Sequence, residues 1–186
     1  METIDNRILL SAKDVAMVIA YPGLTDGLAR SMRQIRHWTQ CDLIKTANSK
    51  HTGRGRSRLY EEEPTIFIAA MLMELSRFGI TVDKMQPLSD WFYEDWEADS
   101  FGVYSGAITG EWIGYISIDW NVDPKTGNFG EPELRVFSDA KSMGYEMEQD
   151  DLVPKSSCST ILNVNQIIDR LNWDYINTVM GRNTWA

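Results

Sequence analysis

The chain of 186 residues is poor in the residue types that most often build covalent frameworks, metal centres and active sites. It contains two cysteines, Cys41 and Cys158, and two histidines, His37 and His51. Two cysteines provide neither a disulfide framework nor a metal-ligand cluster, which indicates a reduced compartment with at most one disulfide. The sequence has no nucleophile elbow, phosphate-binding glycine loop or His/Glu metal motif. We therefore expect no enzyme activity, no catalytic residue, no bound metal and no cofactor.

Long apolar runs are also missing. No run approaches the ~18 residues that a membrane-spanning helix requires, and the apolar stretch in residues 1–10 is too short for a signal peptide. These absences predict a cytoplasmic protein without membrane contact. With 43% hydrophobic residues and seven Trp, the chain can still bury a real core, as one good-sized domain or two small ones.

What the sequence does contain is an uneven division of charge. The net charge is −9, yet residues 1–60 hold ten Lys/Arg and five Asp/Glu, whereas the remainder holds eight and twenty-two. Eight of the cations lie between Arg30 and Arg58, beside one acid, Asp42. Such a cluster is typical of a surface that binds a polyanion. It predicts an N-terminal nucleic-acid-binding part joined to a part with another role.

The N-terminal part carries the signals of four helices. Ile66 to Met73 is apolar on every side, so the third helix should form the centre of this domain. The first helix should begin at a capping box of Ser11 and Asp14 and end near Pro22-Gly23, and the second should begin at Thr25 or Asp26. The third should begin at Glu61 to Pro64 and end at Gly79. The fourth should begin at Thr81, with a kink or restart at Pro87.

The second of these helices carries a basic ridge. Spacings of four and three place Leu28, Met32 and Ile35 on its buried face. A short, rigid helix with a cationic ridge has the shape that enters the major groove of DNA. The basic residues that project away from the buried face are Arg30, Arg33, Arg36 and His37.

Residues 46–57 are rich in turn formers and poor in apolar residues, which predicts a flexible hairpin or wing. Gly53 and Gly55 would keep this wing slim enough to lie in a narrow groove. Leu59 and Tyr60 then return the chain to the core.

Five segments of this N-terminal part carry short motifs, at residues 11–16, 34–38, 42–44, 56–60 and 78–81. In this order they resemble the MerR family of winged-helix transcription regulators, over about residues 9–92. Asp42 stands where the family usually has a glycine in a left-handed turn, a conformation that Asp tolerates better than most residues. The resemblance implies that the second helix reads bases while the wing and its Arg-x-Tyr element grip phosphates. No long heptad helix follows the fourth helix, so the family's dimerisation and promoter untwisting are not carried over.

Side-chain chemistry gives similar roles, because a guanidinium can chelate a guanine edge or fork onto a phosphate. Contacts with phosphates fix the register of the protein on DNA and make affinity depend on salt. We expect base-edge contacts from Arg30, Arg33 and His37, and backbone contacts from Arg36, Lys45, Arg54, Arg56, Arg58 and Tyr60.

The second part reads as sheet followed by one helix. An acidic stretch, residues 94–99, is expected to link two domains, 1–93 and 100–186, in an α+β protein. The expected elements are a hairpin of 101–108 and 111–120 joined by Thr109-Gly110, a turn-rich loop at 123–128, a third strand at 133–137, and a terminal amphipathic helix that carries Ile161, Val164, Ile168, Leu171 and Tyr175.

The role of this second part stays open between several alternatives. The apolar face of the terminal helix, from Ile161 to Tyr175, could be the contact of a homodimer or of a protein partner, or it could pack on its own sheet. The aromatic residues Trp112, Tyr115 and Trp120 could line a pocket for a small-molecule effector, or belong to the core.

The sequence as a whole predicts a sequence-specific double-stranded DNA-binding transcription regulator of bacterial or phage type. The rival is an architectural DNA-binding protein, as in phage excisionases or terminase small subunits.

Overall fold

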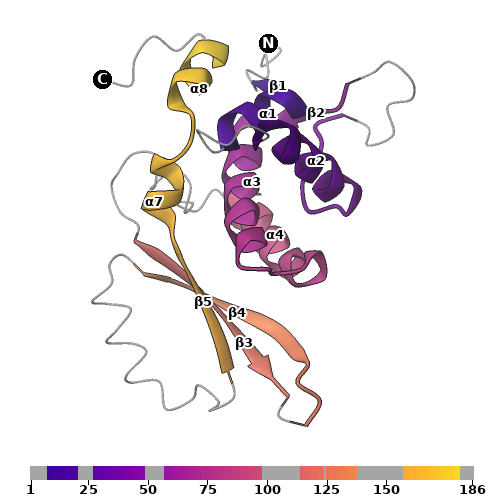
Figure 1. Cartoon of the computed structure of the whole chain (residues 1–186), viewed down its shortest axis with the longest axis vertical. Helices are drawn as coiled ribbons and strands as arrows, with labels where there is room; N and C mark the ends of the chain where they lie inside the picture. The colour runs from indigo at the N-terminus through magenta and orange to yellow at the C-terminus, as the bar shows by residue number, and fades with distance from the viewer. Residues whose placement is uncertain are drawn as a thin grey trace, which may run out of the picture. The chain divides into compact units, whose positions relative to one another are not determined.

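The computed structural model describes residues 8–20, 27–48, 57–97, 114–123, 125–137 and 157–180. These residues form helices and two small antiparallel sheets, which confirms the predicted α+β class (Figure 1). The chain divides into two compact units, one of residues 1–89 with 170–186 and the other of residues 90–169. The first unit is therefore built from both ends of the chain and the second from its middle.

The first unit is helical around a two-stranded sheet. Its β1 and β2 strands pair antiparallel, with Leu10 opposite Tyr60 and Ser11 opposite Leu59. Helix α1 packs against α2, α3 and α8, all within this unit. The elements are β1 (Leu9–Ser11), α1 (Ala12–Ile19), α2 (Gly27–Gln40), β2 (Leu59–Glu61), α3 (Glu62–Arg77), the first part of α4 (Val82–Glu97), and α8 (Trp173–Met180).

Helix α1 begins at the predicted capping box. The Ser11 hydroxyl accepts from the backbone N–H of Asp14 at 3.2 Å, and Asp14 Oδ2 accepts from the Ser11 N–H at 2.9 Å. Two of the donors that every helix start leaves without partners are satisfied in this way. The predicted stop at Pro22-Gly23 and the predicted start of α2 at Thr25 or Asp26 lie outside the described residues.

Two left-handed residues end helices in the first unit. Asp42 has φ 62 and follows α2, while Leu43 N–H donates to the Trp38 carbonyl at 2.9 Å. Gly79 has φ 78 and follows α3, as its sequence position predicts. Between these ends, every described residue from Ile66 to Met73 is buried, which confirms α3 as the centre of this unit.

Helix α4 corrects two expectations. Thr81 precedes it as predicted, and its carbonyl accepts from Met85 N–H at 3.1 Å, but the helix then runs through Pro87 without a restart. Proline removes one helical hydrogen bond, and the burial of Met85 and Leu88 on either side offsets that loss. The helix continues to Glu97, so most of the acidic stretch expected to be a linker is helical, and the boundary between the units falls inside α4.

The second unit contains a three-stranded antiparallel sheet of order β4-β3-β5. Its elements are β3 (Tyr115–Val122), β4 (Phe129–Phe137), β5 (Ser157–Asn163) and α7 (Val164–Asp169), which packs on β3 and β5. Ile116, Ile118 and Trp120 alternate along β3 with Ser117 and Asp119, so the two sets lie on opposite faces of the sheet.

The predicted hairpin partner of β3 was wrong. Strand β3 pairs with β4 through the turn-rich loop and with β5 on its other side, so both of its edges are occupied. The predicted strand at 101–108 lies outside the described residues, and no edge of β3 is available to it. The third predicted strand, 133–137, lies within β4, which is longer than predicted.

The prediction of one terminal helix from Ile161 to Tyr175 was also wrong, because these residues belong to three elements. Ile161 lies in β5, and the chain then forms α7 and α8. The breaks coincide with two asparagines: Asn163 Oδ1 accepts from Gln166 N–H at 3.0 Å, and Asn172 Oδ1 accepts from Tyr175 N–H at 3.1 Å. Asparagine favours such caps over helix interiors, so Asn163 begins α7 after the strand and Asn172 begins α8. The domain expected at 100–186 therefore loses its last helix to the first unit.

Candidate nucleic-acid interface

The basic ridge of α2 lies in solvent. Ile35 and Trp38 are 0% and 2% exposed and fix the inner face of the helix, and Leu28 and Met32 are half-buried beside them. This packing confirms that the predicted apolar face is directed inward. The residues on the outer face, all exposed, are Arg30, Arg33, Arg36 and His37.

The predicted wing has a closed base. Ala47 N–H donates to the Leu59 carbonyl at 2.8 Å, and the Asn48 side chain bonds the Ser57 carbonyl at 3.1 Å and the Leu59 N–H at 3.0 Å. These bonds hold residues 48 and 57 together, as a hairpin requires. Arg54 and Arg56 fall between them, with Gly53 and Gly55, and lie outside the described residues.

A pocket of about 510 Å³ connects the ridge with the base of the wing. Its cations come from three places in the chain: Lys13 belongs to α1, Arg36 belongs to α2, and Arg58 directly precedes β2. No Asp or Glu among the residues that the structure describes lines it. The lining residues are Ser11, Ala12, Lys13, Met32, Arg36, Gln40, Ser57, Arg58 and Tyr60.

Three cations and several hydroxyl and amide groups around one hollow form a site for an anion. Guanidinium groups fork onto phosphate oxygens, and an ammonium adds a mobile point charge. Because Arg36 belongs to both the ridge and the pocket, an anion held there would lie at the edge of the surface that α2 presents. A phosphate of a nucleic-acid backbone fits this chemistry.

The structure gives Tyr60 a different role from the predicted phosphate contact. It is 0% exposed, and its hydroxyl lies 2.9 Å from Thr39 Oγ1. Thr39 Oγ1 donates to the Ile35 carbonyl at 2.7 Å, so the Tyr60 hydroxyl is the donor to Thr39. Tyr60 thus packs beneath the pocket and ties β2 to α2. Lys45, also predicted to contact the backbone, is exposed and does not line the pocket.

Sequence reasoning missed Lys13, Gln40 and Ser57 as members of this site. The signal that could have found Lys13 is the pairing of β1 with β2. That register sets Ser11 opposite Leu59, which brings the first turn of α1 beside Arg58. Residues 9–11 are too short a strand to recognise from alternation alone.

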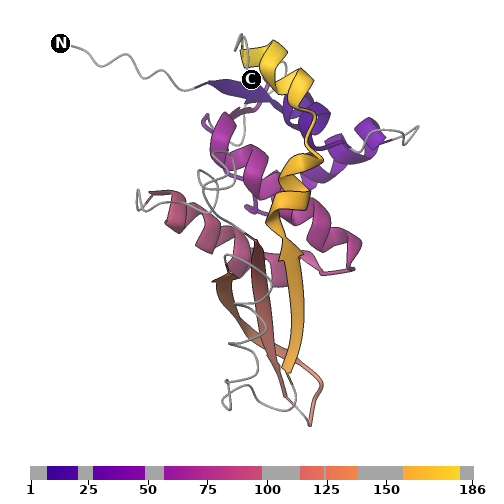
Figure 2. The same ribbon diagram turned by 90° about the vertical axis from the view of Figure 1, so that its left-hand side faces the viewer.

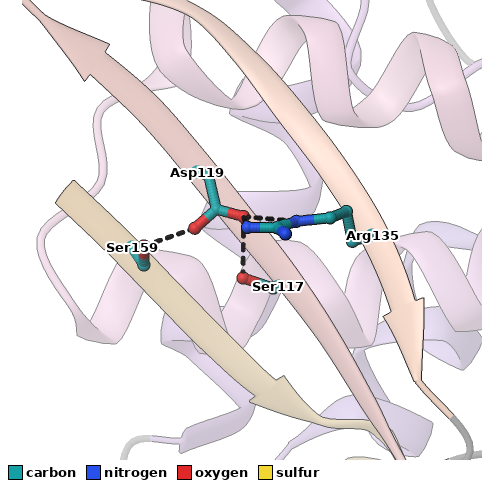
Figure 3. A network of polar contacts seen from close by, with 4 residues as sticks. All are labelled: Ser117, Asp119, Arg135 and Ser159. Carbon is teal, nitrogen blue, oxygen red and sulfur yellow. Dashed lines mark hydrogen bonds and ion pairs between the residues drawn. The ribbon is translucent and has the colours of Figure 1, made fainter. Parts of the chain in front are cut away.

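The polar cluster of the second unit is a closed network (Figure 3). Asp119 Oδ2 accepts from Arg135 Nη2 at 2.9 Å and Nε at 3.2 Å, and from the Ser117 hydroxyl at 3.0 Å. Ser159 donates to Asp119 Oδ1 from the neighbouring strand. Asp119 is 7% exposed and each of these donors is directed at it, so the cluster ties three strands together and offers no open ligand site.

The aromatic residues considered for an effector pocket do not form one in the described part of the chain. Trp120 is 1% exposed and belongs to the core, whereas Tyr115 is half-buried on the other face of β3. Trp112 lies outside the described residues.

Among the described residues, Cys41 and Cys158 are both free thiols, and no group of three or more His, Cys, Asp or Glu is placed to hold a metal ion. None of the helices described here combines the length and the apolar character needed to cross a membrane. Comparisons with protein-family models, curated proteins and solved structures find no match to this chain. The interpretation of the site therefore depends on its geometry and its charge.

Proposed function

We propose that the first unit is a MerR-like winged-helix module that binds double-stranded DNA, and that the protein is a sequence-specific transcription regulator. The observation that carries the proposal is the pocket in which Lys13, Arg36 and Arg58 meet from three separate elements. Cations gathered by tertiary structure around one hollow, next to an exposed basic helix, form a surface suited to a regularly spaced polyanion.

The division of labour on this surface follows from where each side chain lies. Arg30, Arg33 and His37 are exposed on α2, which enters the major groove, and they read base edges. Arg36 and Arg58, at the pocket, bind backbone phosphates and set the register of α2 on the duplex. The arginines of the wing add phosphate contacts beyond its closed base.

Fluorescence anisotropy with a labelled random duplex over a range of salt concentrations tests DNA binding. The wild type should bind in dilute buffer, and log affinity should fall linearly with log salt. The double variant Arg36→Gln/Arg58→Gln should lower the magnitude of that slope by about 2, because two phosphate contacts are lost. The control Arg77→Gln/Lys125→Gln removes the same charge away from the pocket and should keep the slope. Absence of salt-dependent binding by folded wild type would refute the proposal.

Selection from a random duplex library tests the regulatory role. We expect enrichment of a consensus sequence, because α2 presents side chains able to discriminate bases. Enrichment of bent duplexes without a consensus would contradict sequence-specific regulation and indicate the architectural role instead.

A further inference from the structure

Helix α8 belongs to the same unit as the candidate DNA-binding surface, although it lies at the other end of the chain (Figure 2). The Tyr175 hydroxyl donates to Asp14 Oδ1 at 2.7 Å across 161 residues of sequence. Asn172 N–H donates to the Val18 carbonyl at 2.9 Å. The segment around α8 thus contacts both the first and the last turn of α1.

The docking of α8 does not depend on the Tyr175 hydroxyl. Leu171 and Ile176 are 7% and 3% exposed and anchor this segment by apolar burial. Arg170 Nη1 lies 3.4 Å from Glu74 Oε1 of α3 and adds a partly exposed ion pair. The contact between Tyr175 and Asp14 is therefore an addition to a helix that is already held in place.

Asp14 is held at both carboxylate oxygens. Oδ2 accepts from the Ser11 N–H at 2.9 Å and from the Ser11 hydroxyl at 2.7 Å, while Oδ1 accepts from Tyr175. Burial alone would raise the pKa of Asp14, but the hydrogen bonds from Ser11 and Tyr175, with the positive charge of Lys13, leave it lowered. The carboxylate is thus charged, and it lies next to two residues that line the cationic pocket, Ser11 and Lys13.

A carboxylate beside a phosphate site weakens that site in two ways. It repels the phosphate, and it competes for the nearest cation. Hydrogen bonds that saturate its oxygens reduce both effects, because they stabilise the carboxylate where it lies. Without the Tyr175 hydroxyl, Oδ1 loses its donor, and the Lys13 ammonium, whose positive charge already acts on Asp14, can pair with it instead.

We propose that Tyr175 is a positioning residue for phosphate binding: by holding Asp14 Oδ1 at the start of α1, it keeps Lys13 available to the DNA backbone. The proposal rests on the DNA-binding function proposed above. It assigns the C-terminal helix a part in that function which its place in the sequence does not indicate.

The test compares Tyr175→Phe with Lys13→Gln and with both changes together, using the random duplex over a range of salt. Tyr175→Phe should weaken binding at moderate salt and lower the magnitude of the salt slope by about 1, as expected when the phosphate contact of Lys13 is lost. The two changes together should weaken binding no more than Lys13→Gln alone, since both remove the same contact. Thr178→Val is the matched control, because the Thr178 hydroxyl bonds only its own helix at the Asp174 carbonyl, 2.8 Å away.

Asp14→Asn in the Tyr175→Phe background gives a second check. A neutral amide cannot neutralise Lys13, so this change should restore the slope that Tyr175→Phe lowers. Melting temperatures of all variants would establish that binding is measured on folded protein. If the wild type binds DNA and Tyr175→Phe matches it in affinity and slope, or if its effect adds to that of Lys13→Gln, the role of Tyr175 is overturned while the proposed function stands. If the wild type fails to bind, the proposed function itself fails.

Discussion

The two units use arginine in opposite ways. In the first unit Arg30, Arg33 and Arg36 are exposed on α2, and Arg36 meets Arg58 and Lys13 at one pocket. In the second unit Arg135 is directed at Asp119, and their side chains are 17% and 8% exposed. An exposed guanidinium is available to a partner, whereas one committed to a buried carboxylate serves the fold.

This difference shows why the count of cations alone does not locate a binding surface. The pair of Arg135 and Asp119 bridges β4 and β3, and Ser159 extends the network to β5 (Figure 3). The positive charge of Arg135 is thereby balanced within the sheet. The cations Lys13, Arg36 and Arg58 gather instead around a hollow that no acid in the described part of the first unit lines.

The largest expected effect is on the buried pair. Asp119→Ala should destabilise the second unit by ~3 kcal/mol, because it removes the buried carboxylate that half-buried Arg135 pairs with and that two serines donate to. Urea denaturation would measure the loss. Asp123→Ala, an exposed carboxylate of the neighbouring loop, should cost far less. Equal losses for the two variants would contradict a structural role for the pair.

The next effect separates base reading from backbone binding. Arg33→Ala should cost ~1–3 kcal/mol of binding on the preferred duplex and little on random duplexes, because a base-edge contact exists only on the right sequence. Anisotropy titrations with both duplexes would measure this. An equal loss on the two duplexes would show that Arg33 binds phosphate.

A smaller and uniform effect is expected at the pocket. Arg58→Ala should weaken binding to every duplex and lower the slope of log affinity against log salt by about 1. The same titrations, repeated at several salt concentrations, would measure it. A loss confined to the preferred sequence would break the division of labour between α2 and the pocket.

The smallest effect concerns pH. Hydrogen bonds lower the pKa of Asp14 despite its burial, so its contribution to stability is present above its usual pKa of 3.8 and is lost as pH falls through the folded value. The hydrogen bond to Asp14 and burial raise the pKa of Tyr175, so its contribution is present below pH 10.0 and is lost as pH rises through the folded value. The difference in melting temperature between wild type and Tyr175→Phe should narrow as pH falls from 7 to 3. A constant difference would contradict the linkage.

Local signals predicted much of the first unit. The capping box at Ser11, the buried run in α3 and the exposed ridge of α2 each depend on residues close in sequence, where spacing and conformational preference decide. The second unit was predicted less well, because strand pairing joins distant residues. A strand was predicted at 111–120, where β3 lies, but alternation does not reveal which strands lie at its edges.

By itself, therefore, the sequence determined the mixed fold, the charge of the N-terminal part and which face of α2 is buried, since these follow from composition and short-range periodicity. Only the tertiary structure decided that Lys13 joins Arg36 and Arg58, that Tyr60 is buried beneath them, and that α8 returns to α1. These contacts form between segments far apart in the chain, where the partner is selected by packing over the whole unit and not by any local pattern.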